Sequence, residues 1–548
     1  LLYNRLLRVS VRIRVFAAAN FGFRFTYYFR LRKKKSKAAK AEPAFVSRPL
    51  KSVITSFAGS YQWNSLKTLT RIEVSNVIND VYFRSILLGG LVFLVLDFWI
   101  GQTTYGVSSH PVTSVLMEYK GYDYNIFVFI ILVFFTGETL HRDKSTGYAT
   151  INDTFPVKDS VVIGSKFLGM AFISFLLASL PILIGVLVQT SKGYFNYHLS
   201  TYLTDSYLIV FPDYLQMVML VFAVHLLVNN KFAGHAASIG LWLVMIVLRN
   251  FAGYNFNLFF YSYKPDYRWS EMNGLGHFGE PLFWFNLYWM LFGIFLILFL
   301  SIFYSRGTES SFRNRWRTAK TRLLSKTTAV SYVCLALAIG VGAFIYQNVV
   351  YTNQYITSDD QTEQQAAYEK QLKKYEYMAQ PKITDVKLKA DLYPYERNAY
   401  FDADIVMVNK TQEPIDSLHL NSGQLSSFEL LYEGEPLSYR FPLKYNKAKF
   451  QLFGAVQPRE WYKIYRLPYT LMPGDTIAVQ VKSSIENKGF ANGGLSREVV
   501  YNGTFVGGGL PDIGYSAQNE ISSDEDRREH GLPEKDYELP PHDDAYGR

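Results

Sequence analysis

Few residues in this sequence have types and spacings that could do chemistry. "GLGHFG" at 274–279 has the G-x-G-x-x-G pattern of a dinucleotide-binding turn, but no strand precedes it and an apolar run follows. The sequence contains neither the phosphate-binding G-x-x-x-x-G-K-[ST] nor the zinc-binding H-E-x-x-H. His225, His235 and His277 are not spaced as a metal set, and the single Cys334 excludes an intramolecular disulfide. We therefore predict no catalytic residue, cofactor site or metal site in this chain.

Two other polar features lie next to apolar runs and are candidates for function. Asp97 lies within an apolar run, where burying a carboxylate is costly, although it is near enough to the end to reach the interface. Residues 271–279 are interpreted as a tight external loop packed over the mouth of the helices. Its motif residues are Asn273, Gly274, Gly276 and His277.

The segment 137–157, "GETLHRDKSTGYATINDTFPV", separates two of the most apolar runs in the chain. One interpretation is a solvated connector between two spans. The other is a docking element for a cytoplasmic partner, because the segment is long and mixed in charge. It ends in "FPVKDS", where Pro156 can stop one helix and Asp159 or Ser160 can cap the next.

The composition predicts a protein divided between membrane and water. Hydrophobic residues make up 49% and aromatic residues 17% of the 548 residues, yet the mean hydropathy is only +0.01. Strongly apolar segments are therefore averaged with strongly polar ones, and seven runs are long enough to cross a bilayer, the first being short. These runs are 85–101, 121–137, 167–189, 211–228, 232–248, 282–304 and 328–347.

The distribution of charge predicts the orientation of these spans. Residues 1–349 carry a net charge of +18 and residues 350–548 a net charge of −8, which together give the +10 of the whole chain. Lys and Arg gather in 24–71 and 305–327, as in cytoplasmic loops. We therefore expect these loops and 137–166 inside and everything after residue 350 outside, with no role in nucleic-acid binding.

Residues 66–84 place apolar side chains on one helical face and charged ones off it. This spacing fits an amphipathic helix at the membrane interface, and it fits equally a helix packed on another domain. The chain is therefore expected to divide into six segments. They are a basic cytoplasmic segment 1–65, the interfacial helix 66–84, a transmembrane domain 85–349, a helical stalk 350–380, a β-sandwich 381–515 and an acidic linker or truncated element 516–548.

The pattern of the chain changes to alternating apolar and polar residues after Pro381. Segments such as "YFDADIVMV" and "DTIAVQVKS", separated by Pro, Gly and Asn turns, predict short antiparallel strands. Asn409 and Asn502 head N-x-T sequons. The expected fold is thus an α-helical membrane bundle of about six to seven spans followed by an extracytoplasmic antiparallel β-sandwich.

Several segments together resemble one bacterial family, in which an ABC type-2 exporter permease is fused to an aminopeptidase-N-like domain. "FTGETLHRDKSTGYATINDTFPV" is similar to that permease's Y-x-G-E-x-x-W-R-E-R-D … D-A-L-P-V loop. "HLLVNNKFAGH" (225–235), "EMNGLGHF" (271–278) and "SRGTES" (305–310) resemble further signature segments. Residues 380–421 resemble the opening of the peptidase's N-terminal β-domain.

The resemblance implies a membrane-spanning permease driven by a separate cytoplasmic ATPase. Glu138, Arg142, Asp143 and Pro156 would form the loop that couples ATP hydrolysis to the spans. The implied partners are membrane lipid, the ATP-binding subunit and a first permease half or a second permease copy. ATP would bind the partner subunit, and the implied location is the bacterial inner membrane with the C-terminal domain outside the cytoplasm.

Family members are longer than this chain, which lacks the G-x-M-E-N and H-E-x-x-H motifs of the peptidase. Residues 1–23 take the place of a span but contain four arginines, which disfavour insertion. We therefore interpret the chain as a fragment or a degenerate member. The alternatives to a permease are a membrane-anchored zinc aminopeptidase whose catalytic domain is missing here, and a non-catalytic membrane scaffold.

Overall fold

The computed structural model describes residues 59–535 with internal gaps. The gaps are residues 101–102, 105–106, 109, 121–122, 251–254, 307–310, 424, 445–459, 495–497 and 502–507. Most of the predicted basic segment, the end of the predicted acidic segment and the sequon at Asn502 therefore lie outside the described residues.

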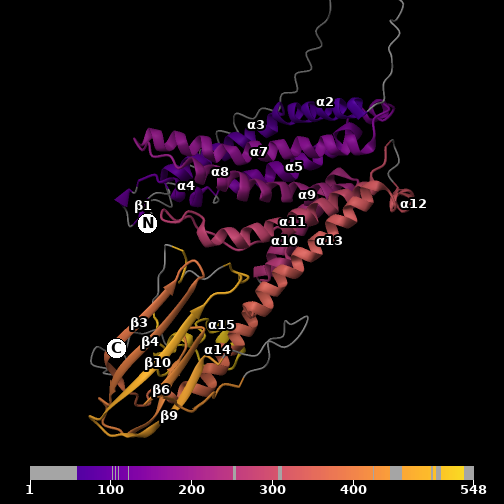
Figure 1. The fold of residues 1–548 in the computed structure, drawn as a ribbon. Helices are drawn as coiled ribbons and strands as arrows, with labels where there is room; N and C mark the ends of the chain where they lie inside the picture. The colour runs from indigo at the N-terminus through magenta and orange to yellow at the C-terminus, as the bar shows by residue number, and fades with distance from the viewer. Residues whose placement is uncertain are drawn as a thin grey trace, which may run out of the picture. The chain divides into compact units, whose positions relative to one another are not determined.

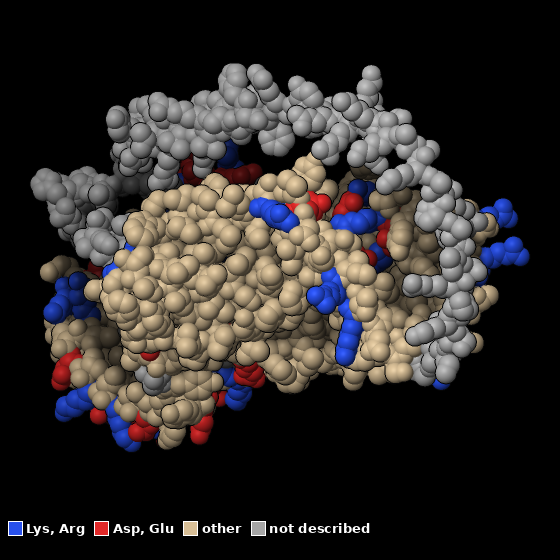
Figure 2. Space-filling view, turned by 90° about the horizontal axis from the view of Figure 1, so that it is seen from above, with Lys and Arg blue, Asp and Glu red and all other residues tan. Residues whose placement is uncertain are grey.

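Seven helices of the described chain are long and apolar enough to cross a membrane, which confirms the predicted helical membrane bundle. They lie side by side (Figure 1), and a broad band of their surface carries no charged side chain (Figure 2). The chain is thus a multi-pass membrane protein. The spans are α3 (Val81–Ile100), α5 (Tyr124–Ser145), α7 (Asp159–Ser191), α8 to α9 (Leu199–Val228), α10 (Lys231–Asn250), η3 to η4 around α11 (Gly276–Phe303) and α13 with η5 (Lys326–Thr352).

The shared core of the bundle is built from large apolar side chains. Phe83 of α3 meets Phe135 of α5 edge to face with ring centroids 5.5 Å apart, and both are buried. Helix α2 (Gly59–Ile78) packs along α7, and α11 (Gly279–Leu300) packs along α13 (Lys326–Tyr346). Side chains on the outer faces, such as Leu243, remain exposed as expected for contact with hydrocarbon.

The predicted helix 66–84 has the wrong boundaries, because two helices share this stretch. Helix α2 ends at Ile78 and α3 begins at Val81. Asp80 separates them, since its Oδ1 accepts hydrogen bonds from the backbone N–H groups of Tyr82 (2.8 Å) and Phe83 (3.3 Å). A carboxylate in this position caps the start of a helix.

The segment predicted as a polar loop from residue 137 is largely helical. Helix α5 continues through the charged residues to Ser145, and a single turn, α6 (Ala149–Asn152), precedes α7. The true connector is only residues 146–158. The predicted span ended at residue 137 because the last two turns of α5 contain charged residues, which lower the local hydropathy.

The part after the last span folds into two antiparallel sheets, which confirms the predicted β-sandwich. The first sheet has the order β3-β4-β10-β6-β7 and the second β11-β5-β9-β8. Their long strands are β3 (Lys382–Tyr393), β4 (Asn398–Val408), β5 (Ile415–Asn421), β6 (Ser427–Tyr432), β9 (Tyr462–Leu471) and β10 (Thr476–Glu486). The remaining strands, β7 (Glu435–Pro436), β8 (Tyr439–Arg440) and β11 (Asp512–Ile513), have two residues each.

Alternation along the strands builds the core between the two sheets. Ala403 and Ile405 of β4 lie opposite Val481 and Val479 of β10, and all four are buried. They pack with Leu418 of β5 and its neighbours in one apolar cluster. Asn409, which heads a sequon, is 1% exposed, and its Nδ2 donates to the carbonyls of Glu413 and Leu471.

Residues 516–535 are not a linker in this structure. They contain η7 (Ala517–Asn519) and α15 (Asp524–Glu529) and pack against α14 (Ser358–Leu372), which lies in the predicted stalk. Two hydrogen bonds of 2.9 and 2.8 Å pair Arg527 of α15 with Glu369 of α14. Both side chains are at most 5% exposed, so this pair locks the segment to the stalk helix.

We predict that Glu369→Gln loosens residues 516–535, because it leaves the Arg527 guanidinium buried without its counter-charge. Losing one partner of a buried ion pair costs about 3–5 kcal/mol. Trypsin should then cleave after Arg528 at least ten times faster in the variant than in the wild type. The control is Asp391→Asn, which breaks the exposed pair with Lys389 (3.5 Å) and should leave the cleavage rate unchanged. Equal rates for the two variants would contradict this account.

We also predict that the β-domain loses stability as the pH falls from about 6.5 towards 4. Burial, with a smaller effect of Arg440, lowers the pKa of His419 from 6.5 to about 4. The unfolded chain therefore binds a proton in this window that the folded chain does not, and acid favours unfolding. Burial raises the pKa of Glu520, but Lys373, Tyr515 and Lys535 donate to the carboxylate and bring the net pKa below 4.5. Its contribution is therefore lost only at lower pH.

Urea unfolding followed by the β-domain's tryptophan and tyrosine signal measures this dependence. His419→Asn should flatten the fall of the midpoint between pH 6.5 and 4.5, at some cost in stability from the lost contact with Tyr462 (3.0 Å). His530→Asn, on the partly exposed end of α15, is the matched control. A slope unchanged by His419→Asn would refute the prediction.

Candidate functional site

The last two turns of α5 gather most of the residues that the sequence singled out. Glu138, Arg142 and Asp143 all lie there, and each forms an ion pair with a different helix. Pro156 lies apart from them, exposed in the connector before α7. The structure thus brings three of the four predicted coupling residues together and separates the fourth.

Lys166 of α7 is the centre of this charged cluster. Its Nζ lies 2.9 Å from Oε1 of Glu73 in α2 and 3.0 Å from Oδ2 of Asp143 in α5. It also donates to the backbone carbonyl of Thr139 at 2.7 Å, and the side chain is only 3% exposed. Arg142 approaches Glu73 at 4.0 Å. One buried ammonium therefore ties α2, α5 and α7 together.

Two further contacts connect the same end of α5 to α9 and α10. Glu138 pairs with Lys231, the first residue of α10. Lys144 donates to Oδ1 of Asn229 at 3.1 Å, and Asn229 ends α9 in the left-handed conformation with φ of 52°. The end of α5 is thus in contact with α2, α7, α9 and α10.

Three histidines fill the space between α5, α9 and α10, a grouping that the sequence did not reveal. Nε2 of His141 lies 3.1 Å from Nδ1 of His225, and the His225 and His235 rings are 4.8 Å apart. Gly137 and Gly234 make room for these rings. Among the residues that the structure describes, no group of three or more His, Cys, Asp or Glu side chains is arranged to hold a metal ion. The three rings pack closely, with one polar contact between His141 and His225.

The connector between α5 and α7 presents an apolar tip. Tyr148, Ile151 and Phe155 are 50%, 58% and 48% exposed. Arg306, in the stretch after α11, hydrogen bonds to the carbonyls of Phe155 (3.2 Å) and Val157 and pairs with Asp159 (2.7 Å). Arg306 therefore holds the backbone of the tip in place, while the large side chains of the tip remain exposed.

The remaining predicted residues lie toward the other ends of the spans. Asp97 is near the end of α3, where its Oδ2 lies 3.4 Å from the backbone N of Asp123. In the 271–279 loop, Gly274 and Gly276 have φ of 63° and 46°, and a backbone bridge joins Gly274 to Ser270. Asn273 lies against Gly276, and His277 is buried against Phe278. The loop is therefore a compact turn closed by backbone hydrogen bonds between Ser270 and Gly274.

The sequence also did not predict a buried ion pair that lies close to that loop. Asp205, in the π-helical turn η1 (Thr204–Val210), pairs with Lys120 at 2.5 Å. It also accepts from Tyr267 and Trp269, each at 2.9 Å. Burial lowers the pKa of Lys120, and the neighbouring Asp205 offsets part of that effect. These contacts hold the 260–270 segment on the helix ends.

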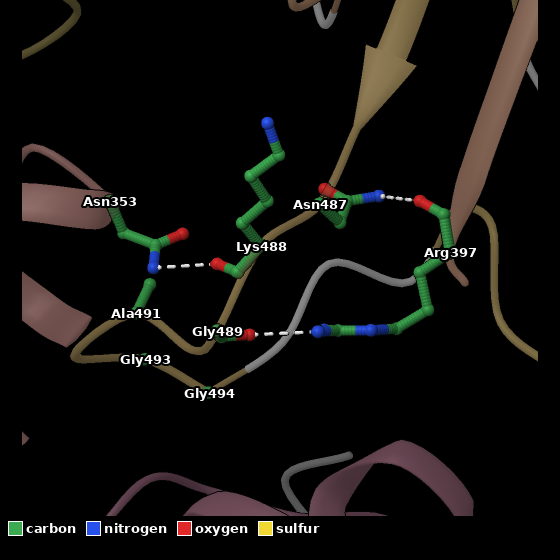
Figure 3. Close-up of a pocket in the computed structure, with 8 residues that line it drawn as sticks. All are labelled: Asn353, Arg397, Asn487, Lys488, Gly489, Ala491, Gly493 and Gly494. Carbon is green, nitrogen blue, oxygen red and sulfur yellow. Dashed lines mark hydrogen bonds between the residues drawn. The ribbon is translucent and has the colours of Figure 1, made fainter. Parts of the chain in front are cut away.

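A pocket of about 310 Å³ lies beside the loop 487–494 of the β-domain, and Figure 3 shows the residues that line it. Asn353 donates to the carbonyl of Lys488 (3.0 Å), Asn487 to that of Arg397 (3.0 Å) and Arg397 to that of Gly489 (2.9 Å). In each of these bonds a side chain donates to a backbone carbonyl of a neighbouring segment, so these side chains stabilise the arrangement of the loops. We assign the pocket a structural role.

The comparisons with known proteins do not identify this chain. No protein family matches the sequence, and no curated protein matches it.

We predict that Gly137→Ala destabilises the bundle by about 1–3 kcal/mol, as overpacking of a tight core does. A Cβ at this position would lie 2.4 Å from Cε1 of His235 and 2.5 Å from Cε1 of His225. Thermal unfolding of the purified protein, followed by fluorescence-detected size exclusion, measures the effect. Gly240→Ala is the matched control, because the space around Gly240 is open and alanine favours a helix. Equal melting temperatures for the two variants would contradict the prediction.

Proposed function

We propose that this chain is the membrane-spanning permease part of an ABC-type exporter, driven by a separate cytoplasmic ATPase. The sequence resemblance of 135–157 to a permease coupling loop suggests it. The observation that carries the proposal is the geometry of the connector between α5 and α7. It combines an exposed apolar tip with a helix end that is ion-paired to several other helices.

Such a geometry is suited to passing a movement from a partner to the spans. A partner that seats on Tyr148, Ile151 and Phe155 would displace the end of α5. Since Lys166 and Glu138 connect that end to α2, α7 and α10, these helices would move with it. The proposed roles are therefore different for the two groups of residues. The exposed side chains bind the ATPase, and Glu138, Arg142 and Asp143 transmit its movement.

The proposed orientation follows from the basic loops. Residues 24–71 and 305–327 are rich in Lys and Arg, which favours the cytoplasmic side of a bacterial inner membrane. Arg306 and Arg322 both form ion pairs with Asp159, the first residue of α7. The end of α5 and the start of α7 therefore lie on the same side of the bundle as these two arginines. The β-domain, which follows a seventh span, would then lie outside the cytoplasm.

A second candidate is a membrane-anchored aminopeptidase. It is favoured by the resemblance of residues 380–421, which fold here as the hairpin β3-β4 and strand β5. This chain holds no H-E-x-x-H, so peptidase activity would need residues outside it. Hydrolysis of aminoacyl anilides by a longer gene product that contains this chain, abolished by a zinc chelator, would favour this candidate.

We predict that Ile151→Asp with Phe155→Asp weakens binding of the ATPase at least ten-fold, as the loss of central apolar contacts does at protein interfaces. Co-expression with a candidate ATP-binding subunit, co-purification and titration measure the affinity. Phe195→Asp is the matched control. Phe195 is 67% exposed but follows the opposite end of α7. If both variants bind the ATPase as the wild type does, the tip is not the docking surface.

Charge reversal of Glu138 together with Arg142 should have a different effect. We expect it to leave ATPase binding nearly unchanged and to abolish transport-stimulated ATP hydrolysis, because it breaks the links to Lys231 and Glu73. Adding Lys231→Glu to Glu138→Lys should restore part of the stimulation. Unchanged stimulation in the doubly reversed variant would rule out the transmitting role.

A further inference from the structure

Helix α12 (Phe312–Arg322) connects the last two spans, and one buried arginine holds it against the end of the α11 span and the end of α9. Nε of Arg315 donates to the carbonyl of Phe303 at 2.9 Å, and its Nη atoms donate to the carbonyls of Leu227 (3.0 Å) and Leu226. Ala319, one turn later, is buried beside it. The face with Arg315 and Ala319 is therefore the inner face of α12.

An aromatic sector lies next to this inner face. Phe312 is 57% and Trp316 is 48% exposed, and their rings lie nearly parallel with centroids 6.3 Å apart. Leu324, in the turn that follows, is 97% exposed. Large apolar side chains in such a row mark a binding surface, and tryptophan is enriched where membrane meets water.

A basic sector follows on the far side of the aromatic one. At 100° per residue, Arg313, Arg317 and Lys320 cluster together, next to Trp316 and away from Arg315. All three are exposed, and Nζ of Lys320 lies 5.8 Å from the Trp316 ring. Residues 311–326 contain no Asp or Glu. The surface of α12 is thus apolar on one side and cationic on the other, without acidic side chains of its own.

We propose that α12 binds anionic phospholipid headgroups of the leaflet beside it, through Arg313, Arg317 and Lys320, with the Phe312 and Trp316 rings at the boundary between headgroups and acyl chains. A short connection to α13 holds the helix at this level. Only Leu323, Leu324 and Ser325 separate it from α13, and Ser325 caps that span by accepting from the backbone N of Thr328 (3.3 Å). A membrane rather than a protein is favoured, because the exposed rings and Leu324 are tied directly to the ends of two hydrocarbon-spanning helices.

The test uses the whole chain in nanodiscs that contain dibrominated phosphatidylglycerol or dibrominated phosphatidylcholine at the same mole fraction. Bromine quenches tryptophan on contact, and the difference between the wild type and Trp316→Phe isolates the signal of Trp316 among the eight tryptophans. We expect several-fold stronger quenching by phosphatidylglycerol, reduced by 0.5 M salt. Equal quenching by the two lipids would overturn the proposal.

The basic side chains are tested by the triple variant Arg313→Gln, Arg317→Gln and Lys320→Gln. Each basic residue near an anionic surface strengthens the attraction to it about five-fold, so the triple variant should lose the several-fold preference and be quenched equally by the two lipids. The matched control removes the same charge from exposed lysines of β3 and should keep the preference. It combines Lys382→Gln, Lys387→Gln and Lys389→Gln.

A different result would identify a protein partner instead. If the α12 triple variant loses association with the ATPase while quenching by the two lipids is equal in the wild type, the surface serves a protein and the lipid proposal fails. Circular dichroism and gel filtration of each variant confirm that a lost preference does not come from unfolding.

Discussion

The burial of the Lys166 ammonium is the constraint on which the charged end of the bundle depends. A cation removed from water costs several kcal/mol unless carboxylates and hydrogen bonds surround it. Here Glu73 and Asp143 supply two carboxylates and Thr139 a carbonyl, from two other helices. Helices α2, α5 and α7 can therefore separate only by exposing or stranding a charge. An apolar contact of the same size would allow them to slide.

Close packing next to this cluster strengthens the same constraint. Gly137 and Gly234 let the His225 ring approach α5 and α10 more closely than any residue with a Cβ would allow. Hydrocarbon does not drive helices together, so contacts between small residues and polar bonds between helices do that work. His141 and His225 supply such a bond. The ion pairs join α5 to α2, α7 and α10, and the tight packing joins α5 to α9 and α10, so both kinds of contact hold the end of α5 against its neighbours.

The sequence predicted those parts of the fold that depend on local pattern. Apolar runs located all seven spans, and alternation located the long strands of the sandwich. What it missed depends on partners far away in the chain. The turns from Glu138 to Ser145 were predicted to be a loop because charged residues lower the local hydropathy. In the folded chain these turns are helical, and Lys231 and Lys166 pair with the partly buried carboxylates of Glu138 and Asp143. Likewise, residues 516–535 looked like an acidic linker because Arg527 finds Glu369 only in the folded chain.

The candidate site, too, was only partly predictable from the sequence. Its position in the chain was visible, because a long charged segment between two spans is uncommon, but the direction of its side chains was not. Helix α12 shows why composition alone cannot supply that direction. Arg313, Arg315 and Arg317 lie two residues apart, yet 100° per residue turns Arg315 inward to cap the carbonyls of Leu226 and Phe303 and leaves the other two outside. Arginine therefore caps buried backbone carbonyls at position 315, whereas two residues away on either side it forms the exposed surface that we propose binds lipid.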